Sequence, residues 1–254
     1  APATAASDCY DRLGLQTYRP APARLLAVAI AETTVLTPAL TGELQHLVAT
    51  TIRPGDQISV ILFSAVGRER HMREVASIGV DALTPADVQR TMPMSRLRDL
   101  QDCSLMTRTA TTKALRDLVG AAAAQASPDI ARSEIVMAIR EIGGKLKASP
   151  AARKNLVLVT DGMEHSTITS FYRQKNLRDI DATEELSKVQ AKANGTDLGG
   201  AEVYIFGGGL AANPDGMRES SGVIALETFW TGWIKHAKGT LVAFGKPTVL
   251  VPIK

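Results

Sequence analysis

Residues 154–162, Lys-Asn-Leu-Val-Leu-Val-Thr-Asp-Gly, decide the fold of this chain. The four consecutive apolar residues from Leu156 to Val159 predict a short strand that is buried on both faces, as strands inside a parallel sheet are. The tripeptide Thr-Asp-Gly follows at once. A carboxylate, that of Asp161, is therefore expected at the carboxyl end of this strand, the edge where open α/β sheets place their ligand sites.

The composition is that of a globular protein. The chain has 254 residues, of which 45% are hydrophobic and 22% charged, enough for one large α/β domain with a sizeable core. The formal net charge is only +3, basic residues are scattered among acidic ones, and 4% of residues are aromatic, so nucleic-acid binding has little support. The apolar runs are too short for a transmembrane segment.

Strand and helix patterns alternate along the chain. Buried strands are expected at residues 24–31, 57–64, 201–206 and 240–244, with an edge-like strand at 71–78 that forms a hairpin with 57–64. Helices are expected at 38–51, 104–126, 130–147, 181–193 and 220–237, and Thr84 caps a further helix with Pro85 at its first position. This order predicts a doubly wound, mainly parallel sheet with helices on both faces and one antiparallel edge strand.

We expect a single domain, because the sequence contains no internal repeat and no low-complexity linker. The expected organisation is an N-terminal arm over 1–23, the main domain over 24–245 with a helical insertion at about 83–127, and a C-terminal tail over 246–254.

The two cysteines, Cys9 and Cys103, bear on location. The chain begins Ala-Pro-Ala-Thr-Ala-Ala-Ser, which resembles a mature end left by signal-peptide removal, although a trimmed chain would begin in the same way. In an exported protein an even pair of cysteines indicates one disulfide, here joining the arm to a loop-like region around Cys103. Two unrelated thiols are the alternative. We therefore expect a periplasmic or secreted protein.

The strand ending in Thr-Asp-Gly, together with the strand–helix–strand opening and the Pro-Gly-Asp turn at 54–56, resembles von Willebrand factor A domains. The resemblance covers about residues 24–245 and implies that fold, with protein binding in a bacterial envelope or secretion setting. In this family a metal-ion-dependent adhesion site takes its ligands from three loops. These are Asp-x-Ser-x-Ser after the first strand, a Thr before the fourth strand, and the Asp of Thr-Asp-Gly.

Only part of that ligand set is present. Aligned on the end of the first strand, Ala31 occupies the Asp position, Thr33 the first Ser position and Val35 the second. A shift of one residue places Glu32 and Thr34 in the pattern, but Leu36 then fills the last position. Ser133 is the best match for the Thr, and Asp161 matches the final Asp. The degenerate site therefore has too little negative charge for tight Mg²⁺ binding.

No cofactor is accordingly expected. The alternative is a weak Mg²⁺ or Mn²⁺ site formed by Asp161, Thr33 and Ser133, with Glu32 as the substitute carboxylate. Without metal, Asp161 accepts hydrogen bonds from backbone N–H groups and from Thr33 or Ser133, and the threonines cap the helix that follows.

The function we expect is non-catalytic binding of a protein partner at the carboxyl edge of the sheet. The candidate contact residues are Thr33, Thr34, Ser133, Asp161, His165, Phe171 and Tyr172. Phe171 and Tyr172 are expected to be exposed in a polar, irregular loop over 163–180, where aromatic side chains can anchor a partner.

Two other functions stay open. A metal-dependent adhesion module is the first alternative. The second is an envelope hydrolase using Asp161, His165 and Ser166 with His71 as a spare base, although no Gly-x-Ser-x-Gly elbow is present. All four histidines are expected at the surface. Gly207-Gly208-Gly209 lacks the spacing of a dinucleotide fingerprint.

The last helical pattern carries two tryptophans, Trp230 and Trp233. They are three residues apart and therefore share a face of the helix. Core packing is the expected role for both.

Overall fold

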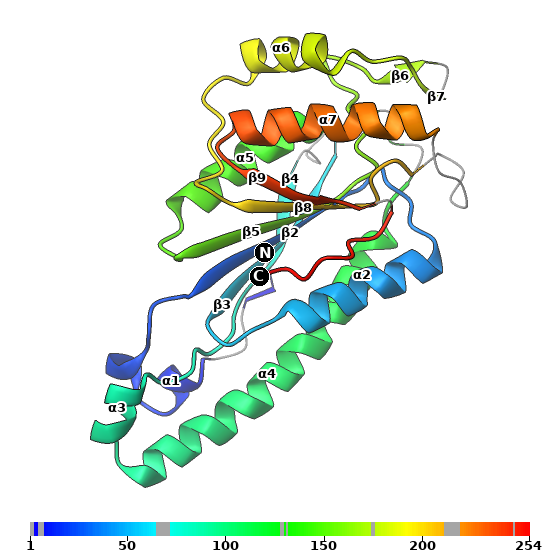
Figure 1. Cartoon of the computed structure of the whole chain (residues 1–254). Coiled ribbons are helices and arrows are strands. Elements are labelled where there is room, and N and C mark those ends of the chain that lie inside the picture. Colours follow the sequence, from blue (N-terminus) through cyan, green and yellow to red (C-terminus); the bar gives the residue numbers. More distant parts are fainter. Residues whose placement is uncertain are drawn as a thin grey trace.

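A seven-stranded sheet forms the centre of the molecule (Figure 1). The computed structural model describes residues 3–4, 8–64, 72–127, 130, 132–173, 176–210, 219–245 and 247–254. Among these residues the strand order is β1-β4-β3-β2-β5-β8-β9. The strands are β1 (Ala3–Thr4), β2 (Arg24–Ala31), β3 (Asp56–Phe63), β4 (Met72–Gly79), β5 (Arg153–Val159), β8 (Glu202–Phe206) and β9 (Thr240–Phe244). All neighbouring pairs run parallel except β3 and β4, which are antiparallel.

Helices cover both faces of the sheet, as the alternating pattern predicts. They are α1 (Cys9–Arg12), α2 (Pro38–Thr51), α3 (Ala86–Thr91), α4 (Met94–Ala123), α5 (Ile135–Ala148), α6 (Ala182–Lys192) and α7 (Ser220–His236), with a 3₁₀ turn at Gln16–Tyr18. Odd-numbered residues of β2 pack towards α5 and α7, and even-numbered ones towards α2 and α4. Because every residue of β2 is buried, its sequence is continuously apolar after Arg24 instead of alternating.

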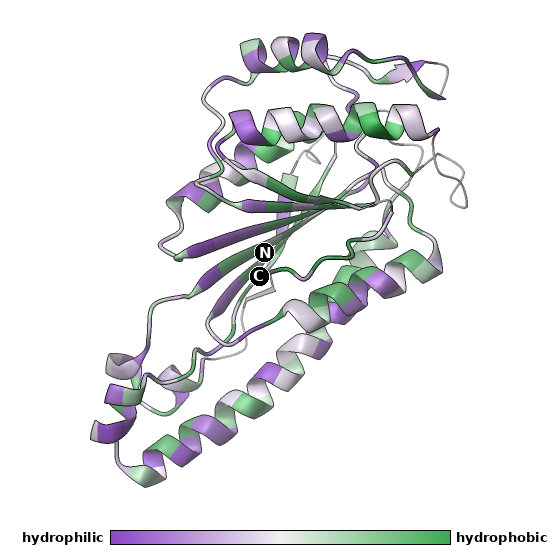
Figure 2. Ribbon diagram, in the orientation of Figure 1, coloured by the Kyte–Doolittle hydropathy of each residue, from purple (hydrophilic) through white to green (hydrophobic). Residues whose placement is uncertain are grey.

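The starts and ends of the central strands differ in polarity (Figure 2). Hydrophilic residues open these strands and hydrophobic residues follow. Arg24 at the start of β2 is 3% exposed and donates from Nε and Nη2 to the carboxylate of Asp56 at 2.9 and 2.6 Å. The same guanidinium donates to the carbonyl of Lys254, so it ties the C-terminal segment to the amino edge of the sheet. None of the described helices is long and apolar enough to cross a membrane.

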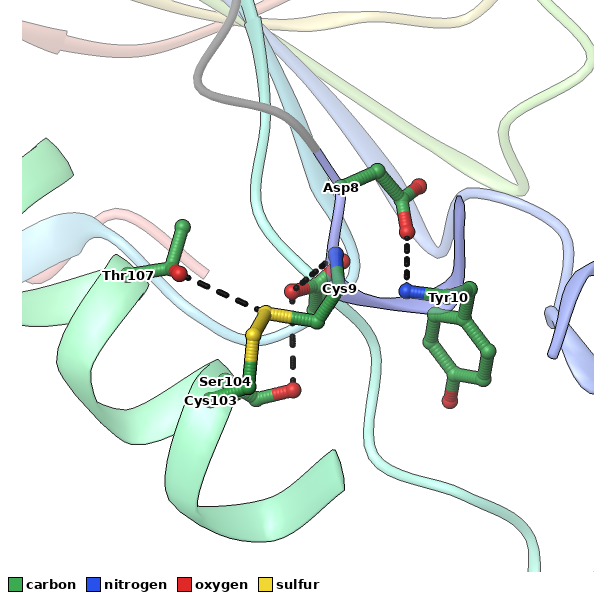
Figure 3. Close-up of a disulfide and its surroundings, with 7 residues drawn as sticks. Asp8, Cys9, Tyr10, Cys103, Ser104 and Thr107 are labelled. Carbon is green, nitrogen blue, oxygen red and sulfur yellow. Dashed lines mark hydrogen bonds between the residues drawn. A yellow bond between two sulfur atoms is a disulfide. The ribbon is translucent and has the colours of Figure 1, made fainter. Parts of the chain in front are cut away.

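A second, small core lies where α4 extends beyond the sheet (Figure 1). It contains Cys9 and Tyr10 of α1, Met92 after α3, and Leu97, Leu100 and Cys103 of α4. Cys9 is disulfide-bonded to Cys103, 94 residues away (Figure 3). Since α1 is only four residues long, this covalent link and a few apolar contacts hold it in place.

Several expected elements differ from the observed ones in this region. Cys103 lies in a helix and not in a loop, because α4 begins at Met94 and not near Ser104. Leu97, Leu100 and Cys103 recur every three residues and face the small core, which favours helix over loop. Thr84 is not a helix cap. Pro85 takes the cap position, and the Thr84 hydroxyl lies 3.3 Å from the Tyr10 hydroxyl.

One further helix boundary and the expected place of one strand in the sheet were wrong. The helix expected from residue 130 begins at Ile135, because Ser133 forms a β-bridge with His165 and its backbone is extended there. Strand β4 is antiparallel to β3 as expected, but it is not the edge strand, since β1 pairs with its outer side at Ala76 and Ser77. The expected strands at 24–31 and 240–244 are confirmed.

Candidate functional site

A buried tryptophan, Trp230, contacts the backbone turn that contains Asp161 and Gly162. Trp230 of α7 is fully buried and donates from Nε1 to the carbonyl of Gly162 at 2.9 Å. Gly162 has a φ of +80°, and a Cβ there would lie 3.1 Å from the indole nitrogen. Glycine is thus required both by backbone conformation and by the close approach of the ring. Trp230 and Trp233 are core residues, as expected.

Asp161 lies at the carboxyl end of β5, as the sequence predicts, and is half-buried. Its Oδ1 accepts a hydrogen bond from the backbone N–H of Met163 at 3.0 Å. The Tyr172 hydroxyl donates to Oδ2 at 3.5 Å, and the Asp161 N–H donates to Thr34 Oγ1 at 3.3 Å. The backbone N–H of Asp161 therefore joins the loop after β2 to the end of β5, while its carboxylate oxygens accept hydrogen bonds from within the loop after β5.

The two hydroxyls of the candidate metal site contact each other. Thr33 Oγ1 donates to Ser133 Oγ at 3.1 Å. Thr33 is half-buried, whereas Thr34 and Ser133 are each 4% exposed. The structure thus brings together the three sequence segments singled out for this site. It also leaves Thr34 and Ser133 beneath the surface, where they support the loops and do not face solvent.

Tyr172 and His165 form the open side of this arrangement. Their rings meet edge to face with centroids 5.6 Å apart, and both side chains are half-buried. His165 Nδ1 pairs with Ser170 Oγ at 2.9 Å, and His165 is bridged to Ser133 through both backbone groups. The expectation that all histidines lie at the surface therefore holds only in part for His165, which is half-buried. His71 lies outside the described residues.

Phe171 is fully buried, which corrects its expected exposure. Its ring packs edge-on against Phe229 of α7 with centroids 4.9 Å apart. The segment over 163–180 is also less irregular than predicted, since β6 (Tyr172–Arg173) and β7 (Asn176–Leu177) pair as a short antiparallel hairpin. Pairing fixes side-chain alternation, so Phe171 turns inward while Tyr172 stays at the surface.

Glu164 is the residue that the sequence interpretation missed. Its side chain is fully buried, and Oε2 accepts a hydrogen bond from the backbone N–H of Val136 at 3.0 Å, in the first turn of α5. Burial raises the pKa of the Glu164 carboxyl to about 7, and hydrogen bonds from Ser166 and from the start of α5 oppose this only in part. Its position three residues after Asp161 is the one signal that could have pointed to it.

Glu32, the expected substitute carboxylate of a metal site, is paired with Arg73. Arg73 of β4 donates from Nη2 to Glu32 Oε1 at 2.9 Å, and Glu32 is 4% exposed. In the described part of the chain, no three Asp, Glu, His or Cys side chains converge on one point. A divalent hard cation needs several convergent oxygens with enough charge. Two mutually bonded hydroxyls and one carboxylate do not fit such an ion.

Among the described residues, Ser166 and His165 form hydrogen bonds with partners other than each other. The Ser166 hydroxyl contacts the carbonyl of Thr169 and the N–H of Ile168, while the partner of His165 is Ser170. In the triple-glycine turn, Gly207 and Gly209 donate to the backbone carbonyls of Pro247 and Asp161. Those two N–H groups are thus already used and do not cradle a phosphate. The turn residues 211–216 lie outside the described part.

The fold and the site permit a comparison with known proteins. No protein-family model and no curated protein sequence matches this chain. Its structure is similar to that of an aerotolerance-related membrane protein from Bacteroides fragilis, with a TM-score of 0.39 and 12% identity over 86% of this chain and 90% of the other. It is also similar to the pilus adhesin SpaC from Lactobacillus rhamnosus GG, with a TM-score of 0.42 and 13% identity over 84% of this chain and 27% of the adhesin.

Proposed function

We propose that this chain is a non-catalytic, extracytoplasmic protein-interaction module of the von Willebrand A type. It binds a protein partner at the carboxyl edge of the sheet without a metal ion. The observation that carries the proposal is the 3.1 Å hydrogen bond from Thr33 to Ser133. Hydroxyls that would bind a cation in the resembled family here hold two loops together by themselves. The loops are thereby positioned for binding without metal.

The carboxyl-edge surface that remains available consists of Thr33, Val35, Asp161, His165 and Tyr172. Val35 is 41% exposed, and it replaces a ligating hydroxyl by an apolar contact. Tyr172 presents an aromatic ring beside the Asp161 carboxylate, and tyrosine is one of the residue types enriched at energetically important interface positions. Thr34, Ser133 and Phe171 support this surface from beneath and are not partner contacts themselves.

Three observations support the remaining parts of the proposal. The Cys9–Cys103 disulfide favours an oxidising compartment, which supports a periplasmic or secreted location. The pairing of His165 with Ser170, and of Ser166 with Thr169, supports a role without catalysis. The Glu32–Arg73 ion pair supports binding without Mg²⁺ or Mn²⁺, because it neutralises the carboxylate that such an ion would require.

Site-directed photo-cross-linking in the native host tests the proposal. A photoreactive amino acid is placed at Val35 or at Tyr172, and at the exposed Arg90 of α3 as the control. We expect the same protein to be captured from positions 35 and 172 but not from position 90, with equal yield in EDTA and in Mg²⁺. Capture that requires Mg²⁺ would support the metal-dependent alternative, and equal capture from position 90 would refute the carboxyl-edge surface.

A second variant distinguishes direct contact from support. Asp161→Asn can keep the Oδ1 acceptor for the Met163 N–H, while it removes the charge and replaces the acceptor of the Tyr172 hydroxyl by an amide nitrogen. We expect this variant to unfold at an unchanged temperature and to lose the cross-link from position 172. Hydrolytic turnover by the purified protein that disappears in His165→Ala would refute the non-catalytic role.

A further inference from the structure

A polar cavity of about 310 Å³ opens at the amino edge of the sheet, opposite the carboxyl-edge surface. Arg153, Lys154 and Asn155 at the start of β5, Glu202 at the start of β8 and Lys254 line it. Figure 2 shows the hydrophilic colour of these strand starts. The volume lies at the small end of the range for ligand sites and equals that of about ten water molecules.

Asn155 supplies the inner wall and is 2% exposed. Its Nδ2 donates to Glu202 Oε2 at 3.2 Å. A carboxylate can only accept hydrogen bonds, so the nitrogen and not the oxygen of the amide must face it. The orientation of the amide is thereby determined by its partner.

This orientation leaves Asn155 Oδ1 buried without a hydrogen-bond partner among the described residues. The Tyr204 hydroxyl donates to Glu202 Oε2 at 2.9 Å. Buried acceptors in native proteins are almost always paired with protein, water or ligand. Asn155 and Glu202 both line the cavity, so an unpaired amide oxygen lies buried next to its wall, beside a carboxylate.

The outer end of the cavity has the opposite charge. Arg153 and Lys254 are exposed and Lys154 is half-buried, and none of the three forms an ion pair with another side chain in the described part of the chain. Neighbouring lysines do form such pairs, since Lys147 and Lys238 both contact Asp197. Acceptors at the inner end and cations at the rim are complementary to a ligand with an ammonium group and a carboxylate.

We propose that this cavity binds a small zwitterion of the α-amino-acid class. Its ammonium group pairs with Glu202 and lies next to the amide of Asn155, and its carboxylate pairs with Arg153, Lys154 and Lys254. The cavity is separate from the carboxyl-edge surface, so this proposal does not depend on the proposed function.

Isothermal titration calorimetry with the full chain tests this proposal. The probes are glycine, L-alanine and L-aspartate, with acetate and methylammonium as singly charged controls. We expect the amino acids to bind and the controls not to bind at the same millimolar concentration. Failure of all three amino acids to bind, or equal binding of acetate, would overturn the proposal.

Two variants locate the binding. Asn155→Leu removes the unpaired acceptor and should weaken binding by about tenfold to a hundredfold, the usual effect of a hydrogen bond to a charged group. Arg153→Gln changes an exposed rim residue and should weaken binding without affecting folding, so it keeps the test decisive if Asn155→Leu does not fold. Lys113→Gln on α4 is the matched surface control. Unchanged affinity in both Asn155→Leu and Arg153→Gln would refute the assigned site.

Discussion

The buried carboxyl group of Glu164 makes the stability of this protein depend on pH near neutrality. Folding raises its pKa from 4.5 to about 7, chiefly because burial removes the solvation of the charged form. The folded state therefore binds more protons than the unfolded state between these values. Since stability falls with pH wherever the folded state holds the extra proton, Glu164 lowers the free energy of unfolding as pH rises from 4.5 to 7.

The magnitude of this loss of stability follows from the size of the pKa shift of Glu164. One pKa unit corresponds to about 1.4 kcal/mol, so the loss amounts to about 3 kcal/mol and is complete above the folded pKa. Glu164→Gln keeps a carbonyl acceptor for the Val136 N–H and cannot ionise. Relative to wild type, the variant should therefore gain about 3 kcal/mol of stability as pH rises across this window.

Urea unfolding followed by circular dichroism at a series of pH values measures this difference. The control is Glu43→Gln, which changes an exposed side chain of α2. A stability difference between wild type and Glu164→Gln that stays constant with pH would refute the reasoning. It would mean that the carboxyl group keeps its solvation, or that α5 moves to release it.

Three further predictions concern the contribution of single residues, or of the disulfide, to the stability of the folded protein. Replacing both Cys9 and Cys103 by Ala should lower stability by about 4 kcal/mol, because the bond closes a loop across 94 residues; an unchanged melting temperature would contradict this. Burial and the neighbouring Asp8 raise the pKa of Asp81 to about 6, so stability should fall as pH rises towards 6 and fall less in Asp8→Asn, as denaturant titrations can show. Gly162→Ala should cost about 1–2 kcal/mol because its φ of +80° is left-handed, and a calorimetric scan equal to wild type would disprove the strain.

Much of the architecture could be predicted from local patterns. Continuous apolar runs marked β2 and β5 because both strands are buried on two faces. The Thr-Asp-Gly ending placed Asp161 at the carboxyl edge, since a strand's direction fixes which end its last residues occupy. The even cysteine pair anticipated the Cys9–Cys103 bond.

Helix boundaries were less predictable where tertiary contacts override local signals. Thr84 has the chemistry of a cap, yet its hydroxyl contacts Tyr10, 74 residues away. Ser133 falls within a pattern that favours helix, yet its backbone pairs with His165. Propensity reports only neighbours in sequence, so contacts of this kind leave no local trace.

The sequence by itself determined the α/β class, the position of Asp161 and the poor charge of the metal-like loop, because strand burial and ligand type are properties of short segments. Only the tertiary structure decided that Phe171 is buried, that Arg73 pairs with Glu32 and that Glu164 meets the first turn of α5. Each of these depends on which distant backbone or side chain lies opposite. In a folded chain that is a matter of packing, and packing decides both the solvation of a carboxylate and the access of a partner to it.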